Sequence, residues 1–194
     1  DSFAGYAKVN ASRGVQVSLQ SPPLALPYKV YFPLILQEGG CYEALVNGDF
    51  EAGFSGDPWV QIPYGLIFSG RARSGSYAAW LGGYNDRDEH LYQTVTIPAG
   101  ATAITLTYQW YMTTTETIHP WDYLYAGVRD AGGFPLTTFP ALNDGSQANA
   151  WYPSSAYNLT AYAGRTIEIH FQATTDYFKP TSFFVDDVSL TVCR

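Results

Sequence analysis

The sequence is poor in charged residues and in long apolar segments, and each shortage excludes a class of protein. Charged residues make up 14% of its 194 residues and hydrophobic ones 46%, a balance too apolar for a disordered chain. Lys and Arg together number 10, are scattered along the chain and leave a net charge of −7, so no basic surface for nucleic acid is expected. No segment approaches the ~20 apolar residues of a membrane-spanning helix.

The common catalytic motifs are also missing. The sequence contains no Gly-x-Ser-x-Gly, His-Glu-x-x-His or Cys-x-x-Cys, and no glycine-rich loop that could hold a phosphate. The three histidines, His90, His119 and His170, stand far apart in sequence. His170 falls on the outer side of a predicted strand, where we expect a solvated side chain. The sequence therefore predicts a non-catalytic protein.

Tyrosine, glycine and proline are abundant instead, with 16, 18 and 12 residues, which is typical of short strands joined by turns. Two stretches alternate strictly between apolar and polar residues, 104–112 and 167–173. The predicted strands are 44–51, 65–69, 77–82, 90–97, 102–113, 122–130, 135–139, 165–174 and 182–192. About nine strands without a helical period predict an all-β fold, an antiparallel jelly-roll sandwich over residues 41–194.

The only two cysteines, Cys41 and Cys193, stand at the two edges of this predicted sandwich. We predict that they form a disulfide, in which the Cα atoms are usually about 4.4–6.8 Å apart, and this places the first and last strands side by side. The alternative is two unrelated thiols. The chain opens at Asp1 without a basic and then apolar leader. Together with the disulfide, this start favours a mature extracellular or cell-surface protein whose signal peptide has been removed.

Residues 1–40 differ from the rest and predict an extended N-terminal arm without a core of its own. Val15, Val17 and Leu19 share one face of an extended segment. Three prolines follow in residues 21–27 and predict a stiff connector. We expect residues 28–36, which are mostly apolar, to strap their own domain, and residues 3–19 to pair with the sheet edge of a neighbouring copy.

Several motifs resemble those of the galactose-binding-like jelly rolls, a group that includes carbohydrate-binding modules of secreted glycosidases and MAM domains of adhesion proteins. They are Asn-Gly-Asp-Phe-Glu at 47–51, Trp59, the segment 74–82, Leu-Tyr-Gln-Thr-Val-Thr-Ile-Pro at 91–98 and Phe-Val-Asp-Asp-Val-Ser-Leu at 184–190. The resemblance extends over residues 44–192. It implies the jelly-roll fold and specifies a ligand only weakly.

Four carboxylates lie on the two runs that the disulfide would bring together. They are Asp49, Glu51, Asp186 and Asp187. Such a group would repel itself without a cation, and Ca²⁺ prefers oxygen ligands. The resemblance implies a structural Ca²⁺ with Glu51 and Asp186 among its ligands. Val185 and Val188 can both face the core only if a β-bulge falls at the two aspartates. Alternatively, the carboxylates are solvated or held by backbone N–H groups.

Aromatic residues in loops are the candidates for sugar contact, because sugar rings stack on exposed Trp and Tyr faces. Trp121, in a polar loop, is the best candidate, and Tyr84 and Trp80 follow. Trp80 also fits core or lid packing, as do Trp59 and Trp151.

Three functions remain open from the sequence. The first is a structural or adhesive protein, a surface filament subunit whose partner is a copy of itself, because strand addition that does not close generates a fibre. The second is a carbohydrate-binding module that binds polysaccharide through its loop aromatics. The third is an accessory domain cut from a larger secreted enzyme. We rank the filament subunit first.

Overall fold

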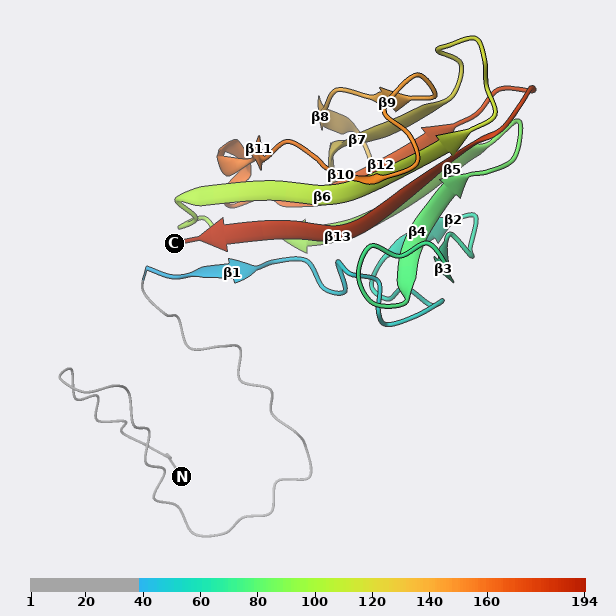
Figure 1. Ribbon diagram of the computed structural model, residues 1–194. Helices are drawn as coiled ribbons and strands as arrows, with labels where there is room; N and C mark the ends of the chain where they lie inside the picture. Colours follow the sequence, from blue (N-terminus) through green and yellow to red (C-terminus); the bar gives the residue numbers. More distant parts are fainter. Residues whose placement is uncertain (1–38) are drawn as a thin grey trace, which may run out of the picture. The chain divides into compact units, whose positions relative to one another are not determined.

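The computed structural model describes residues 39–194 (Figure 1). The predictions for the arm, including Val15, Val17 and Leu19 and the strap at 28–36, lie outside the described residues. The strands are β1 (Cys41–Glu43), β2 (Val60–Ile62), β3 (Ile67–Ser69), β4 (Tyr77–Gly82), β5 (Asp88–Thr96), β6 (Ala103–Thr114), β7 (Tyr123–Asp130), β8 (Pro135–Thr138), β9 (Leu142–Asn143), β10 (Trp151–Pro153), β11 (Tyr157–Asn158), β12 (Thr166–Thr174) and β13 (Thr181–Cys193). One 3-10 helix, η1 (Thr160–Tyr162), precedes β12.

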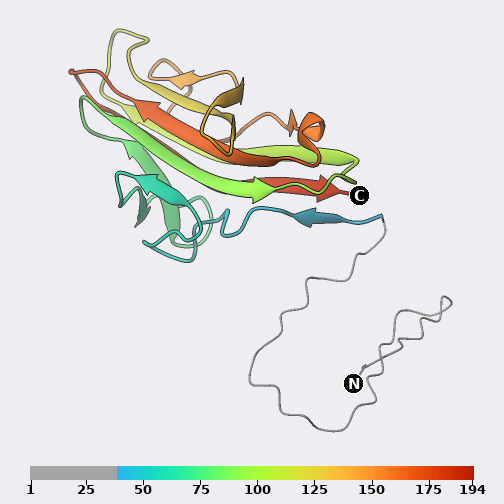
Figure 2. The ribbon, with the colours of Figure 1, turned by 180° about the vertical axis from the view of Figure 1, so that it is seen from behind.

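These strands form two antiparallel sheets that pack into a sandwich (Figures 1 and 2). The seven-stranded sheet has the order β10-β6-β13-β4-β3, with β1 paired to β13 and β11 paired to β6. The six-stranded sheet has the order β2-β5-β12-β7-β8, with β9 paired to β7. The predicted all-β jelly-roll sandwich is confirmed. In the described part of the chain, no helix is long and apolar enough to cross a membrane.

The core lies between the sheets and follows the predicted alternation. On β6 the inward side chains from Ile104 to Met112 are all buried, and on β12 those from Ile167 to Ala173 are buried as well. Trp110, which the alternation places inward, and Trp59 belong to this core. The outward positions of β12 and of its neighbours β5 and β7 carry polar and aromatic side chains, and this is where the candidate site forms.

The first and last strands lie side by side, as the cysteines predicted. Cys41 and Cys193 form a disulfide, and β1 pairs with the end of β13. The predicted β-bulge is also present, because the register between β13 and β6 shifts between Asp186 and Ser189. Asp187 takes a φ of 47°, and Val185 and Val188 on either side of the bulge are both buried.

The predicted strand at 44–51 is wrong, because this segment is a series of turns. Asn47 and Phe50 have φ values of 56° and 58°, which a strand does not accommodate. Phe50 is fully buried and packs 5.3 Å from the ring of Trp59, whose indole N–H donates to the Asn47 carbonyl. The short strands β1, β2, β9, β10 and β11 were not predicted, since two or three residues carry no visible alternation.

Candidate functional site

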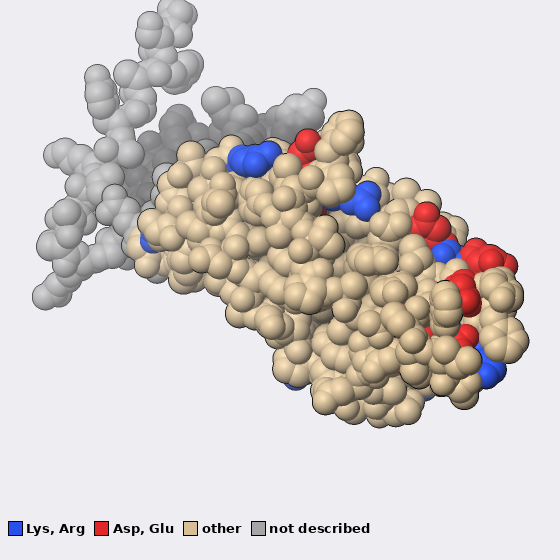
Figure 3. Space-filling model, turned by 90° about the horizontal axis from the view of Figure 1, so that it is seen from above, with Lys and Arg blue, Asp and Glu red and all other residues tan. Residues whose placement is uncertain are grey.

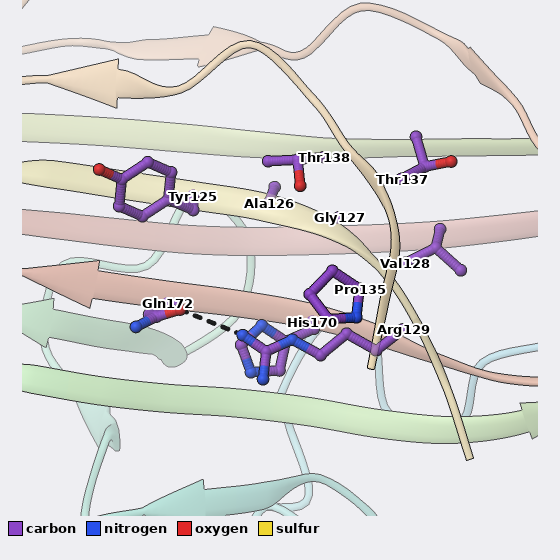
Figure 4. A pocket seen from close by; sticks show the side chains of 10 residues that line it. All are labelled: Tyr125, Ala126, Gly127, Val128, Arg129, Pro135, Thr137, Thr138, His170 and Gln172. Atoms are coloured by element: carbon purple, nitrogen blue, oxygen red, sulfur yellow. Dashed lines mark hydrogen bonds between the residues drawn. The ribbon is translucent and has the colours of Figure 1, made fainter. Parts of the chain in front are cut away.

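A groove crosses the outer face of the six-stranded sheet. It consists of two neighbouring pockets that share Arg129 and His170 in their linings. The first has a volume of about 310 Å³ and extends to Thr137 on β8 (Figure 4). The second has a volume of about 430 Å³ and extends over Tyr92 on β5 to Ile62 on β2. Together they form what we call the cross-strand groove, which extends from β8 over β7, β12 and β5 to β2.

Strand periodicity places the side chains of this groove. On β12, Ile169 and Phe171 enter the core, so His170 and Gln172 face outward. The same alternation turns His90 and Tyr92 outward on β5, and Tyr125 and Arg129 outward on β7. Because β12 lies between β5 and β7, three short outward runs from distant parts of the sequence meet on one surface.

Hydrogen bonds hold the groove side chains in a fixed arrangement. The Arg129 guanidinium donates to Gln172 Oε1 at 3.1 Å, the contact drawn in Figure 4. The Gln172 amide in turn donates to Asp88 Oδ1 at 2.7 Å. Asp88 also lies 3.3 Å from His90 Nε2, and His90 Nδ1 lies 3.2 Å from His170 Nε2. Side chains held in this way lose little conformational entropy when they bind a ligand.

His170 is buried, contrary to the prediction of a solvated side chain. Only 5% of it is exposed, because the ring of Tyr92 stacks on it at 5.9 Å and His90 packs beside it. Its register partner on β7 is Gly127, which has no side chain to hold the imidazole away from the sheet. Burial, together with the nearby charges of Arg129 and His90, lowers the pKa of His170 to about 3, and the charge of Asp88 opposes this shift. The imidazole is therefore uncharged at neutral pH.

Aromatic rings stand in both halves of the groove. Tyr125 lines the first pocket and stacks on Tyr123 with ring centroids 5.6 Å apart. Tyr92 lines the second pocket, and all three tyrosines are half-buried. Each half therefore combines an apolar ring with polar groups. Glu168 adds a carboxylate to the second half, where burial raises its pKa and the charge of Arg129 opposes that rise.

The three aromatic residues predicted to contact a ligand do not line the groove. Trp121 and Tyr84 are 55% and 56% exposed in loops between strands. Trp80 lies on the outer face of the other sheet, stacked on Phe184 and 5.8 Å from Tyr84. In Figure 3 most of the visible Asp and Glu side chains gather at one end of the sandwich, Lys and Arg are scattered, and much of that face is uncharged. The sequence contained one usable signal for the groove, the polar and aromatic outward positions of its central strands.

The four carboxylates predicted to hold calcium face hydrogen-bond donors. Asp186 is fully buried and accepts the backbone N–H groups of Arg73, Ser74 and Asp187, although burial still raises its pKa to about 6. Glu51 Oε1 accepts the N–H groups of Ser76 and Tyr77, both at 2.7 Å.

Asp187, the third of the four carboxylates, forms an ion pair with the Arg73 guanidinium at 2.7 Å. Asp49 is exposed, and its carboxylate lies 3.5 Å from the Glu51 N–H. Within residues 39–194, no three His, Cys, Asp or Glu side chains come together as a metal site. In this arrangement the carboxylates fit N–H donors rather than a shared cation, and calcium binding stays a prediction.

Comparison with known proteins identifies the fold. No protein-family model matches the sequence, and no curated protein matches it either. Among solved structures, the carbohydrate-binding module TmCBM61 in complex with β-1,4-galactotriose is 17% identical with a TM-score of 0.55, and the match covers 77% of this chain and 97% of that one.

Two further structures match at similar levels. The K3 cleaved adhesin domain of Lys-gingipain from Porphyromonas gingivalis W83 is 22% identical with a TM-score of 0.52, over 78% of this chain and 99% of that one. The non-crystalline cellulose specific module CBM28 is 17% identical with a TM-score of 0.50, and the match covers 82% of this chain and 99% of that one. These similarities show the fold, a β-sandwich jelly roll.

Proposed function

We propose that this protein is a non-catalytic carbohydrate-binding module and that the cross-strand groove holds a segment of a polysaccharide chain. The observation that carries the proposal is the groove itself, two adjoining pockets on the sheet in which polar side chains are already held by hydrogen bonds. Ligand sites typically combine apolar lining with a few fixed polar groups, and their volumes of roughly 300–1,000 Å³ include those of both pockets.

The chemistry of the groove suits sugar hydroxyl groups, which both donate and accept hydrogen bonds. Arg129 offers only donors, Glu168 in its ionised form offers only acceptors, and Gln172 and the neutral His170 offer both. Tyr125 and Tyr92 add ring faces on which the apolar face of a sugar can pack. A chain that enters along the groove would meet one tyrosine on each side of His170.

The charges of the groove favour a neutral polysaccharide. Arg129 is the guanidinium of the groove lining, Glu168 lines the same pocket, and Asp88 is connected to Arg129 through Gln172. The positive charge is thus offset within the site, so a uronic acid would gain little attraction and would meet the Glu168 carboxylate. The disulfide fits an oxidising compartment, and we place the protein outside the cell.

The comparisons support this function over the filament subunit, which the sequence analysis ranked first. Two of the matched structures are carbohydrate-binding modules of the same fold, and one of these was solved with β-1,4-galactotriose. The filament hypothesis depends on residues 1–38, which lie outside the described part of the chain. Light scattering of the full chain tests it, since long polymers would favour a structural role.

The proposal is tested by titrating the full chain with soluble neutral polysaccharides, including β-1,4-galactan and non-crystalline cellulose derivatives, in affinity gels and by calorimetry. Arg129→Ala should weaken binding by roughly 10- to 100-fold, because hydrogen bonds to a charged group contribute about 1.5–3 kcal/mol. Trp121→Ala is the matched control outside the groove and should bind like the wild type. Loss of binding in the Trp121 variant alone would place the site in the loops, and no binding to any glycan would refute the function.

A further inference from the structure

We propose that His90 and His170 form a binding site for a transition-metal ion such as Zn²⁺ or Cu²⁺ on the floor of the cross-strand groove. Both imidazoles line the larger pocket and come from the neighbouring strands β5 and β12. The inference does not depend on sugar binding, and its test uses the metal ion alone.

The spacing of two imidazole nitrogens matches that of a pair of metal ligands. His90 Nδ1 and His170 Nε2 are 3.2 Å apart, and their rings are tilted by 52° rather than stacked. Zinc binds imidazole nitrogen at 2.0–2.1 Å in tetrahedral sites, so two such nitrogens on one ion lie roughly 3.3 Å apart. An ion could therefore bind between them with little movement of the strands.

Asp88 orients the first ligand. Its Oδ1 lies 3.3 Å from His90 Nε2, which assigns the imidazole proton to Nε2 and leaves the lone pair of Nδ1 directed at His170. A carboxylate behind the ring is the usual support for a metal-bound histidine, because it fixes the tautomer and raises the basicity of the ligand. His170 must carry its proton on Nδ1 when the metal is bound, a change of tautomer that releases no proton.

Charged side chains on neighbouring strands surround the pair. Arg129 faces His170 from β7 and opposes a cation. Asp88 on β5 and Glu168 on β12 offset that charge, so the surroundings carry one guanidinium against two carboxylates.

The site is open, which predicts weak and exchangeable binding. In the described part of the chain no third His, Cys, Asp or Glu completes the group, so water or a ligand would fill the remaining positions. Imidazole ligands suit zinc and copper, whereas calcium and magnesium prefer oxygen. The chain has three histidines, and both its cysteines are in the disulfide, so a nitrogen-bound metal can be assigned cleanly.

The test is calorimetric titration of the full chain with ZnCl₂ at neutral pH. One ion per chain should bind, and His90→Gln and His170→Gln should each lower the affinity by at least about tenfold. Asp88→Asn should weaken binding with both ligands intact. His119→Gln is the matched control, because His119 lies in a loop against Asp144, and it should bind like the wild type. Melting curves of each variant confirm that it is folded.

Electron paramagnetic resonance of the Cu²⁺ form supplies a second measurement, in which two imidazole nitrogens should be coupled to the ion and one in either groove variant. Absence of stoichiometric binding, or unchanged affinity in both groove variants, would show that the 3.2 Å contact is a hydrogen bond only. Loss of binding in His119→Gln would place the metal at the loop and overturn the proposal. Failure of sugar binding would leave this result unaffected.

Discussion

Cys41 lies directly opposite Cys193 in the antiparallel pair of β1 and β13, with a Cα–Cα distance of 4.0 Å. The disulfide between them joins residues 152 apart in sequence and encloses nearly the whole sandwich. In the chain-entropy model, a loop of this length restricts the unfolded chain strongly and stabilises the fold by ~5 kcal/mol.

The first prediction follows from this bridge. Replacing both cysteines by serine should lower the free energy of unfolding by up to ~5 kcal/mol, because the unfolded chain regains its freedom. Denaturant unfolding of the wild type and the double variant measures the difference. Mass spectrometry without reductant should find one intramolecular bridge. Two free thiols, or equal stability of both proteins, would contradict the pairing.

The second prediction concerns calcium binding by the four carboxylates Asp49, Glu51, Asp186 and Asp187. If Ca²⁺ binds there, EDTA lowers the melting temperature, because an ion that binds only the folded state stabilises it. Glu51→Gln should then remove most of this sensitivity. Asp57→Asn changes an exposed acid that is not one of these four, so this control variant should keep the sensitivity to EDTA. A melting curve indifferent to EDTA and to added Ca²⁺ would show that N–H donors alone satisfy Glu51 and Asp186.

The third prediction concerns Asp122, which is fully buried at the start of β7. Burial raises the pKa of this carboxyl group, as do the negative charges of Asp176 and Asp144, while hydrogen bonds oppose the rise. The folded state thus holds the proton more tightly than the unfolded chain. The resulting stabilisation is complete below the ordinary pKa and is lost as the pH rises through the folded pKa, by up to ~1.4 kcal/mol per pH unit.

Asp122→Asn removes this titration. Its free energy of unfolding should therefore change less between about pH 4 and pH 7 than that of the wild type. Denaturant unfolding over this range, with Asp57→Asn as an exposed control, provides the measurement. Identical pH profiles for the wild type and the Asp122 variant would mean that Asp122 titrates alike in the folded and unfolded states.

Much of the fold was predictable because it follows from local alternation. The period of two on β6 and β12 placed their inward residues, and the spacing of Val185 and Val188 required the bulge at Asp187. The prediction of a strand at 44–51 failed because the left-handed backbone at Asn47 and Phe50 accompanies the packing of Phe50 on Trp59. This packing cannot be read from the sequence.

The groove was not predicted because it is assembled from strands that are distant in sequence. His90, Arg129 and His170 meet only once β5, β12 and β7 have paired in register. The burial of His170 depends equally on this pairing, since Tyr92 covers it from one strand and Gly127 leaves space on the other. Loop aromatics such as Trp121 can be identified from the sequence alone, whereas the groove requires the pairing of strands.

The most direct test of sugar binding in the cross-strand groove is an NMR titration of the full chain with a soluble oligosaccharide from whichever polysaccharide binds. We expect the backbone amide signals of Gly127, Arg129, His170 and Gln172 to shift with one common affinity, because these residues form the floor of the groove. Signals from the exposed loop residues Tyr84 and Trp121 should stay in place. Shifts confined to those loops, with the groove signals unmoved, would contradict sugar binding in the groove.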